Sequence, residues 1–402
     1  MPSLLSIARR RYWAASQTVP VPDLVAIDLP GGEEFVEALV SIWDAGDAAA
    51  PLDQRLAPAA RQAQAAALAP TWVIDAGGAR RQSQGRPVRA GDALVMATSG
   101  STGVPKGVVL TRDAIVASAV ATSSRLGVRA ARHRWLACLP LSHIGGFSVV
   151  ARALLTGTAL EVHPGFDAER VMASATTGTF VSLVPAALRR VQATSFCCVV
   201  LGGSAPPSEL PDNTVTTYGM TETGSGVVYD GYPLEGVELA LTPAGEILLR
   251  APMLARAYRD GSPVADSDGW LHTGDSGFIG ADGRLEVQGR LTDMLVTGGE
   301  NVWPAPVEHL LSQHPEVREV ALSAVPDEQW GDKLVAVVVP FDPAAHVDLV
   351  ELREIVKAQL AAFAAPKAVV TVESLPRTSI GKLRRDELRR WLVAGDGSPA
   401  TW

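Results

Sequence analysis

The sequence has few cysteines, few aromatic residues and no long apolar run. Of its 402 residues, three are cysteines and 5% are aromatic. Cys138, Cys197 and Cys198 form no CxxC pair, so neither a disulfide framework nor a zinc knuckle is expected. Apolar runs such as residues 334–340 are far shorter than the ~20 residues that span a bilayer. These absences argue against a disulfide-rich or transmembrane protein and favour a reducing, cytoplasmic setting.

Basic residues are fewer than acidic ones: the sequence has 35 Lys and Arg residues and 43 Asp and Glu residues, which gives a net charge of −8. Nucleic-acid binders carry basic surfaces, so no nucleic-acid partner is expected. The first 22 residues lack an apolar segment followed by a small-residue cleavage site, so no secretory signal is expected. Length and an apolar content of 47% indicate an ordinary globular protein of two or three domains.

Short β-rich runs alternate with helical patterns between residues 93 and 217. Strands are expected at 93–98, 134–139, 180–184 and 197–201, and helices at 112–124, 148–155, 167–175 and 186–192. This alternation predicts an α/β fold with mostly parallel sheets covered by helices. Residues 236–289 are short alternating stretches separated by turns, which predict a small antiparallel sheet or a barrel-like subdomain.

A compact α+β unit is expected from Thr292 onward. Its predicted helices are 304–312 and 349–362, and its predicted strands are 317–324, 334–339 and 368–372. We therefore predict two domains, a large one at 1–291 with the parallel sheets and the small β subdomain, and a small mobile one at 292–402.

Residues 98–107, TSGSTGVPKG, are the most informative stretch. Glycines let a backbone approach phosphate, hydroxyl groups donate hydrogen bonds, and Lys106 adds a positive charge. The stretch is not a Walker A loop, because no Gly-Lys-Ser/Thr closes it. A surface turn is the alternative interpretation, but the lysine and the apolar strand before it favour a phosphate site.

Three other enzyme classes lack their motifs. No GxSxG occurs, as a serine hydrolase of the α/β type would need. The seven histidines are scattered, which argues against a metal hydrolase. No GxGxxG follows a first strand, which argues against a dinucleotide-dependent dehydrogenase.

Seven motifs follow one another along the chain. They are TSGSTGVPKG (98–107), LPLSHIGG (139–146), LGGSAP (201–206), TYGMTET (217–223), GWLHTGD (269–275), GRLTDMLVTGGEN (289–301) and PRTSIGKL (376–383). In this order they resemble the acyl-adenylate-forming enzymes, which include acyl-CoA synthetases, luciferases and peptide-synthetase adenylation domains. The resemblance runs from about residue 92 to 390. It implies a ligase that uses ATP and Mg²⁺ to make an acyl-AMP and then passes the acyl group to a thiol such as that of CoA.

The resemblance assigns the nucleotide to a set of residues in these motifs. They are Thr98, Ser99, Gly100, Ser101, Thr102, Gly103, Lys106, Gly202, Gly203, Ser204, Tyr218, Gly219, Met220, Asp275 and Arg290. Tyr218 and the Gly202–Ser204 segment would enclose adenine. Asp275 would accept hydrogen bonds from the ribose hydroxyls, and Arg290 would reach the ribose or a phosphate. Taken alone, these two also fit a turn aspartate and a solvated arginine.

Four residues are implied in catalysis by the resemblance: Lys382, His143, Thr221 and Glu222. The Lys382 ammonium would stabilise negative charge during adenylation. Glu222 would hold Mg²⁺, which prefers carboxylate and phosphate oxygens, while Thr221 contacts the α-phosphate. His143 would line the acyl pocket, although a lone histidine near apolar residues is more often structural.

The thioester half-reaction is implied to use a second arrangement of the domains. The small domain would rotate at Thr292, a position where the family more often has Asp or Lys, and Gly298, Gly299 and Glu300 would then line the thiol's route.

Three further strings resemble the 2-succinylbenzoate–CoA ligase family of menaquinone biosynthesis, especially its actinobacterial members. They are SLVPAALRR (182–190), VVLGGSAPPSEL (199–210) and YGMTETGSGVVYDGYPLEG (218–236). The second carboxylate of that acid needs a donor or a cation, and Arg189 and Arg190 lie near the expected acyl site without being assigned to it. Another aryl or fatty acid, or a carrier-protein thiol, stays an alternative. The short N-terminal part favours a homodimer.

Overall fold

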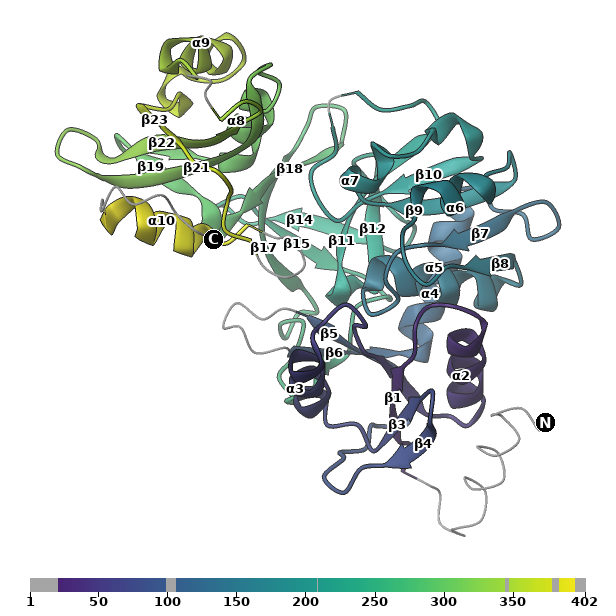
Figure 1. Cartoon of the computed structure of the whole chain (residues 1–402). Helices are drawn as coiled ribbons and strands as arrows, with labels where there is room; N and C mark the ends of the chain where they lie inside the picture. Colours follow the sequence, from purple (N-terminus) through teal and green to yellow (C-terminus); the bar gives the residue numbers. More distant parts are fainter. Residues whose placement is uncertain (1–20, 99–105, 208, 344–346, 378–382, 395–402) are drawn as a thin grey trace. The chain divides into compact units, whose positions relative to one another are not determined.

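The computed structural model describes residues 21–98, 106–207, 209–343, 347–377 and 383–394 (Figure 1). The chain forms two compact units. The first comprises the chain up to Ala240 together with Leu248–His272 and Ala281–Leu285. The second comprises Leu241–Ile247, Thr273–Gly280 and the chain from Glu286 onward. Within the described ranges, no helix combines the length and apolar character needed to cross a membrane.

The first sheet of the first unit has the strand order β16-β6-β5-β2-β1-β3-β4. Its strands are β1 (Leu24–Asp28), β2 (Ala48–Pro51), β3 (Trp72–Asp75), β4 (Gly78–Arg81), β5 (Asp92–Thr98), β6 (Lys106–Thr111) and β16 (Ala257–Tyr258). Helices α2 (Glu33–Asp44) and α3 (Pro58–Leu68) pack on this sheet. The strands β2, β1 and β3 are parallel, whereas β5 and β6 pair antiparallel. The sequence analysis predicted the strand that corresponds to β5, and the residues before it add the unpredicted strands β1 to β4.

The second sheet has the order β13-β12-β11-β10-β9-β7-β8. Its strands are β7 (Arg134–Ala137), β8 (Ala159–Val162), β9 (Thr179–Leu183), β10 (Cys198–Leu201), β11 (Thr214–Met220), β12 (Ser225–Tyr229) and β13 (Tyr232–Pro233). Five adjacent strands of this sheet are parallel, as predicted, namely β11, β10, β9, β7 and β8. Strands β9 and β10 are buried along their whole length, which explains why their sequences are continuous apolar runs.

Two helices lie between the sheets (Figure 1). Helix α4 (Arg112–Arg125) contacts β5, β6 and β12, and helix α5 (Ile144–Thr156) contacts β7, β8 and β9. Helix α5 starts earlier than predicted because Gly146 is a packing residue and not a loop residue. A Cβ at Gly146 would lie 2.4 Å from the Pro140 carbonyl oxygen. Helices α6 (Ala168–Ala173) and α7 (Pro185–Leu188) are shorter than predicted.

A four-stranded sheet follows in the order β14-β15-β17-β18. Its strands are β14 (Glu238–Leu241), β15 (Glu246–Arg250), β17 (Leu271–Ile279) and β18 (Leu285–Arg290). The first and last strands are not paired with each other among the described residues, so the sheet is open. The prediction of a small antiparallel sheet or a barrel-like subdomain is met by a sheet, and no closed barrel is present among the described residues.

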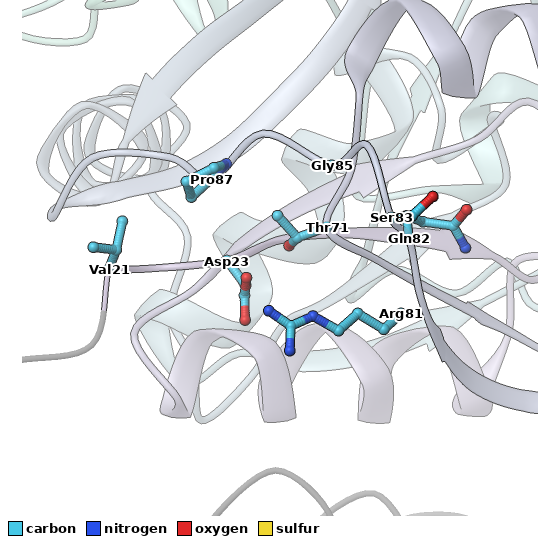
Figure 2. A pocket seen from close by; sticks show the side chains of 8 residues that line it. All are labelled: Val21, Asp23, Thr71, Arg81, Gln82, Ser83, Gly85 and Pro87. Carbon is cyan, nitrogen blue, oxygen red and sulfur yellow. The ribbon is translucent and has the colours of Figure 1, made fainter. Parts of the chain in front are cut away.

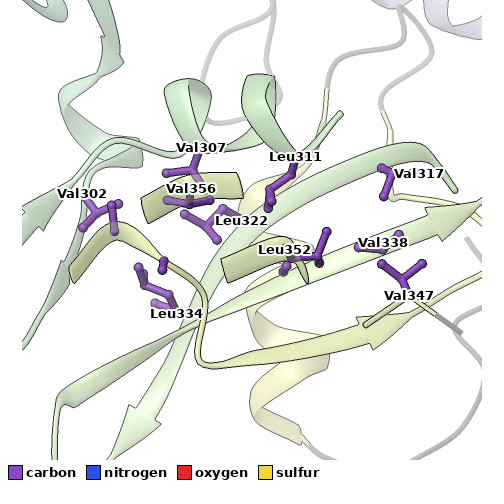
Figure 3. Close-up of a cluster of buried hydrophobic side chains, with 14 residues drawn as sticks. Val302, Val307, Leu311, Val317, Leu322, Leu334, Val338, Val347, Leu352 and Val356 are labelled. Carbon is purple, nitrogen blue, oxygen red and sulfur yellow. The ribbon is translucent and has the colours of Figure 1, made fainter. Parts of the chain in front are cut away.

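The remainder of the second unit contains a two-stranded sheet and a three-stranded sheet with helices on both faces (Figure 3). The two-stranded sheet pairs β19 (Leu295–Thr297) with β20 (Glu300–Val302). The three-stranded sheet consists of β21 (Val317–Asp327), β22 (Gly331–Pro340) and β23 (Ala368–Thr371), and the helices are α8 (Pro304–Leu311), α9 (Leu349–Gln359) and α10 (Arg385–Ala394). Strand β22 pairs antiparallel with β21 and parallel with β23. The predicted helices and strands are all present here, with shifted ends.

Strand β22 divides the apolar residues of this unit into two cores. Alternate side chains of a strand point to opposite faces. Leu334, Ala336 and Val338 therefore pack with Leu352 and other residues on the α8 and α9 side. Their neighbours along the strand pack on the opposite face with Leu388 of α10.

We expect Leu352→Ala to lower the free energy of unfolding of the second unit by about 2–5 kcal/mol, because it leaves a cavity in a closed core. Leu352 is fully buried. Hydrogen exchange of the β21 and β22 amides measures the change. The control is Val350→Ala in the same helix, where the side chain is exposed, with an expected effect below about 0.5 kcal/mol. Equal losses in both variants would contradict this account of the core.

Candidate active site

The carboxyl ends of the parallel strands β9, β10 and β11 meet at one edge of the second sheet. A cavity of about 130 Å³ lies at this edge. Four predicted nucleotide-binding residues line it, namely Gly202, Gly203, Gly219 and Met220. Helix α5 contributes Ile144, Gly145, Ser148 and Arg152. In α/β sheets, ligands bind at the carboxyl ends of the strands, so the position of the cavity fits a substrate site.

The glycines at this edge are required by close backbone contacts. A Cβ at Gly202 would lie 2.5 Å from the Thr217 hydroxyl, and one at Gly219 would lie 2.2 Å from the Ser225 carbonyl oxygen. Gly203 has a φ of +87°, which other residues rarely adopt. A flat backbone surface therefore follows β10, while Tyr218 lies on the neighbouring strand β11. Ser204 comes directly after the glycines and is exposed.

Glu222 lies in a 3-10 turn, η2 (Thr221–Thr223), immediately after β11. Its backbone carbonyl accepts a hydrogen bond of 2.7 Å from the Ala255 amide, and its carboxylate accepts one of 3.1 Å from the Tyr258 hydroxyl. Burial, together with the negative charge of Glu222, raises the pKa of Tyr258, which keeps the phenol protonated as the donor. The Lys106 ammonium lies 5.6 Å from the centre of the Tyr258 ring.

Tyr258 thus connects the lysine of the phosphate motif with the predicted magnesium ligand. Strand β16, which carries Tyr258, pairs with β6, which begins at Lys106. Thr98 faces Lys106 in the β5–β6 pair, and its hydroxyl donates a hydrogen bond of 3.3 Å to the Lys106 carbonyl. The intervening residues Ser99, Gly100, Ser101, Thr102 and Gly103 lie outside the described residues, as does Lys382.

His143 precedes α5 and contacts two polar residues that the sequence analysis did not single out. Its Nε2 atom lies 2.5 Å from Nη2 of Arg55 and 3.4 Å from Oδ2 of Asp53. Arg55 lines a second cavity of about 560 Å³, together with Asp53, Arg190 and the segment 139–142. Neither Arg189 nor Arg190 lines the cavity at the strand edge. The guanidinium carbon of Arg190 lies 5.1 Å from the ring centre of Phe166, and Arg189 is exposed.

Arg152 is the charged residue of the strand-edge cavity. It is 2% exposed, and its Nη2 atom donates a hydrogen bond of 3.2 Å to the Ser225 hydroxyl. Its guanidinium carbon lies 4.6 Å from the ring centre of the buried Trp135. The buried atoms Nε and Nη1, which carry three of the five N–H donors, have no hydrogen-bond partner among the described residues. Burial lowers the pKa of Arg152, but a guanidinium stays protonated at neutral pH.

A buried cation with three unused donors can bind one carboxylate of a ligand through a forked pair of hydrogen bonds. The sequence analysis missed Arg152 because the helix SVVARALL looks like an ordinary amphipathic helix with one basic residue. Only the packing of α5 against β7 and β12 places this residue beneath the cavity.

The remaining predicted site residues belong to the second unit. The Arg290 Nε atom pairs with the Asp275 carboxylate at 2.9 Å, and its Nη1 atom donates a hydrogen bond to the Thr273 carbonyl. Thr292 lies in the 3-10 turn η3 (Leu291–Asp293). Gly298 and Gly299 have positive φ values, and Glu300 begins β20. The ribose, hinge and thiol-route roles of these residues stay predictions.

A further cavity, of about 650 Å³, lies beside β3 and β4 of the first sheet (Figure 2). It is lined by Val21, Asp23, Thr71, Arg81, Gln82, Ser83, Gly85 and Pro87. None of the predicted site residues lines it. Within the described ranges, no three His, Cys, Asp or Glu side chains gather to hold a metal ion. A magnesium ion at Glu222 would thus depend on phosphate oxygens for its other ligands, as is usual for nucleotide-bound Mg²⁺.

The glycine-lined strand edge, with Lys106 and the Glu222 carboxylate both beside Tyr258, fits a site for a phosphate-bearing ligand. The chain belongs to the AMP-binding enzyme family, which matches residues 73–259, and the C-terminal domain of that family matches residues 306–382. The resemblance to acyl-adenylate-forming enzymes that the motifs predicted is confirmed.

Proteins named as 2-succinylbenzoate–CoA ligases are similar to this chain. One of Mycobacterium tuberculosis, named as probable, is 38% identical over an alignment of 325 residues, and the match covers 74% of this chain and 84% of that protein. One of Bacillus cereus is 34% identical, and the match covers 74% of this chain and 69% of that protein. The solved o-succinylbenzoate CoA synthetase of Bacillus subtilis with its acyl-adenylate intermediate has a TM-score of 0.82 at 27% identity, covering 99% of this chain and 92% of that one.

We expect Arg152→Met to leave the ligand-free protein as stable as the wild type or more stable, by up to about 4 kcal/mol, because it removes a buried charge with unused donors. Denaturant unfolding measures the change. In the control Arg256→Met, the buried Asp92 loses two hydrogen bonds of 2.8 Å, so a loss of about 3–5 kcal/mol is expected. A comparable loss in Arg152→Met would mean that Arg152 is already satisfied without a ligand.

Proposed function

We propose that this protein is an ATP-dependent acid–thiol ligase whose acid is 2-succinylbenzoate and whose thiol is CoA. In the first half-reaction, an oxygen of the succinyl carboxylate attacks the α-phosphorus of ATP, and pyrophosphate leaves. In the second, the CoA sulfur attacks the acyl carbon, the thiol gives up its proton, and AMP leaves with the electrons of the broken C–O bond. The names of the relatives support this choice of substrate.

The observation that carries the proposal is the pair of guanidinium nitrogens of Arg152, Nε and Nη1, that have no hydrogen-bond partner among the described residues. 2-Succinylbenzoate has two carboxylates, of which only one reacts, so the other must be accommodated in the pocket. A buried carboxylate is tolerated only when it is paired and hydrogen-bonded. Arg152 offers a buried cation with three free donors, and Ser148, Ser182 and Ser225 line the same cavity. A fatty acid or benzoate would leave this charge without a partner, which makes those acids the weaker candidates.

The catalytic roles carried over from the family form part of this proposal. Thr98, Lys106 and the loop between them bind phosphates, and the Gly202–Gly203 backbone and Tyr218 enclose adenine. Thr221 contacts the α-phosphate. Glu222 provides the protein oxygen for Mg²⁺, which when bound neutralises phosphate charge. Its carboxylate is partly exposed and, beside its hydrogen bond to Tyr258, keeps a lone pair for an ion.

The two-domain cycle with a hinge at Thr292 also stays a prediction, as do the boundaries 1–291 and 292–402. The homodimer likewise rests on the sequence argument alone. We place the reaction in the cytoplasm because ATP and CoA are available there. A carrier-protein thiol in place of CoA is the alternative that shares the first half-reaction.

The proposal is tested by AMP release with ATP, Mg²⁺ and CoA over a panel of acids. The panel holds 2-succinylbenzoate, 4-oxo-4-phenylbutanoate, which lacks only the ring carboxylate, benzoate and a long-chain fatty acid. Wild type should prefer 2-succinylbenzoate, whereas Arg152→Met should lose about 100-fold or more of kcat/KM for it and little for the analogue.

The matched control is Arg189→Met, which changes an exposed arginine and should keep the wild-type preference. A wild-type preference for a monocarboxylic acid would refute the substrate. Pyrophosphate exchange with 2-succinylbenzoate but no CoA-dependent turnover would indicate a carrier-protein thiol instead.

Lys382→Ala tests the division of labour between the half-reactions. We expect it to abolish acyl-AMP formation, because the ammonium stabilises the charge that develops in that transition state. Thioester formation from supplied acyl-AMP and CoA should keep the wild-type rate. Both half-reactions are measured separately, and a variant in which both keep their rates would show that Lys382 has another role.

A further inference from the structure

Asp53, Arg55 and His143 form a polar cluster that no motif of the sequence predicted. Asp53 follows β2 and is 3% exposed. Arg55 binds its carboxylate with both arms of the guanidinium, Nε to Oδ1 at 2.9 Å and Nη2 to Oδ2 at 2.7 Å. The Arg55 backbone amide donates a third hydrogen bond to Oδ1. The guanidinium is thereby fixed in one plane, although half of the Arg55 side chain is exposed.

The charge of Asp53 is stabilised despite its burial. Burial alone would raise the pKa of this carboxyl, but the hydrogen bonds from the side chain and backbone of Arg55 outweigh it and hold the pKa well below its usual range. Asp53 is therefore a carboxylate at every pH at which the enzyme works, and Arg55 keeps its anchor.

The cluster determines which nitrogen of His143 carries the proton. Arginine can only donate hydrogen bonds, so Nε2 of His143, at 2.5 Å from Nη2 of Arg55, must be the acceptor. The ring proton of the neutral imidazole is then on Nδ1. His143 comes immediately before Ile144 and Gly145, which line the strand-edge cavity. Fixing this ring therefore fixes an Nδ1–H donor on the residue that directly precedes the cavity-lining residues Ile144 and Gly145.

We propose that Asp53 and Arg55 are positioning residues for His143, which hold its imidazole in one orientation and as the neutral Nδ1–H tautomer during adenylation. The inference rests on the proposed function, because it gives His143 its place beside the reacting carboxylate. A neutral imidazole retains one donor for an oxygen of the substrate and does not form the ion pair that an imidazolium would make with the ground-state carboxylate.

A double-mutant cycle on the full chain tests the inference through ATP–pyrophosphate exchange with 2-succinylbenzoate. The single variants are Asp53→Asn, Arg55→Met and His143→Ala. We expect each to lower kcat on the order of tenfold with KM for ATP changed less than about twofold. In the His143→Ala background, Asp53→Asn and Arg55→Met should cause no further loss, because the residue that they position is absent.

Asp75→Asn is the matched control, since it makes the same substitution in a carboxylate that lies outside the predicted site. The Asp75 carboxylate is paired with Arg80, with 2.5 Å between Oδ2 and Nη2. It should leave kcat unchanged. If Asp53→Asn does not fold, the Arg55→Met cycle decides, because the Arg55 side chain is half exposed. Arg55→Lys should recover less than half of the rate lost in Arg55→Met, because an ammonium lacks the fork that joins the carboxylate to the imidazole.

Losses that multiply in the double variants would overturn the inference, since Asp53 and Arg55 would then act independently of His143. An unchanged rate in His143→Ala or in Arg55→Met would overturn it as well. These outcomes differ from failure of the proposed function, in which the wild type itself would exchange pyrophosphate with none of the acids.

Discussion

Parallel pairing of β9, β10 and β11 is the constraint on which the site depends. Parallel strands need crossover connections, so all three carboxyl ends emerge at the same edge and their following segments are brought together. Residues distant in sequence, such as Gly203 and Met220, line one cavity for this reason. Helix α5 packs beneath the same edge and closes the cavity from the other side.

Two buried charged groups differ in how far their hydrogen bonds are satisfied. Arg152 is buried with donors that the described protein does not satisfy, whereas the Asp53 carboxylate accepts hydrogen bonds from the side chain and backbone of Arg55. The first arrangement costs stability in the ligand-free protein, and the second strengthens a local structure. An unsatisfied buried donor is therefore the better guide to where a ligand binds.

The sequence predicted the fold best where patterns are local. The strands β9, β10 and β22 were foreseeable from uninterrupted apolar runs, and the site motifs from their glycines and hydroxyl residues. Arg152, Tyr258 and Arg55 were not, because their roles depend on contacts between segments far apart in the chain. Tyr258 reaches Glu222 only through the pairing of β16 with β6, and a two-residue strand has no legible pattern. The start of α5 was misplaced because glycines usually signal loops.

The alternation along β22 has a consequence for how such enzymes can diverge. The apolar side chains on both faces of the β21–β22–β23 sheet are covered by helices. Helices α8 and α9 cover one face, and α10 covers the other. A segment that contains its own complete hydrophobic core can be exchanged between homologues, because the exchange requires no new core packing. Substitutions elsewhere in the chain can therefore accumulate without disturbing the packing around this sheet.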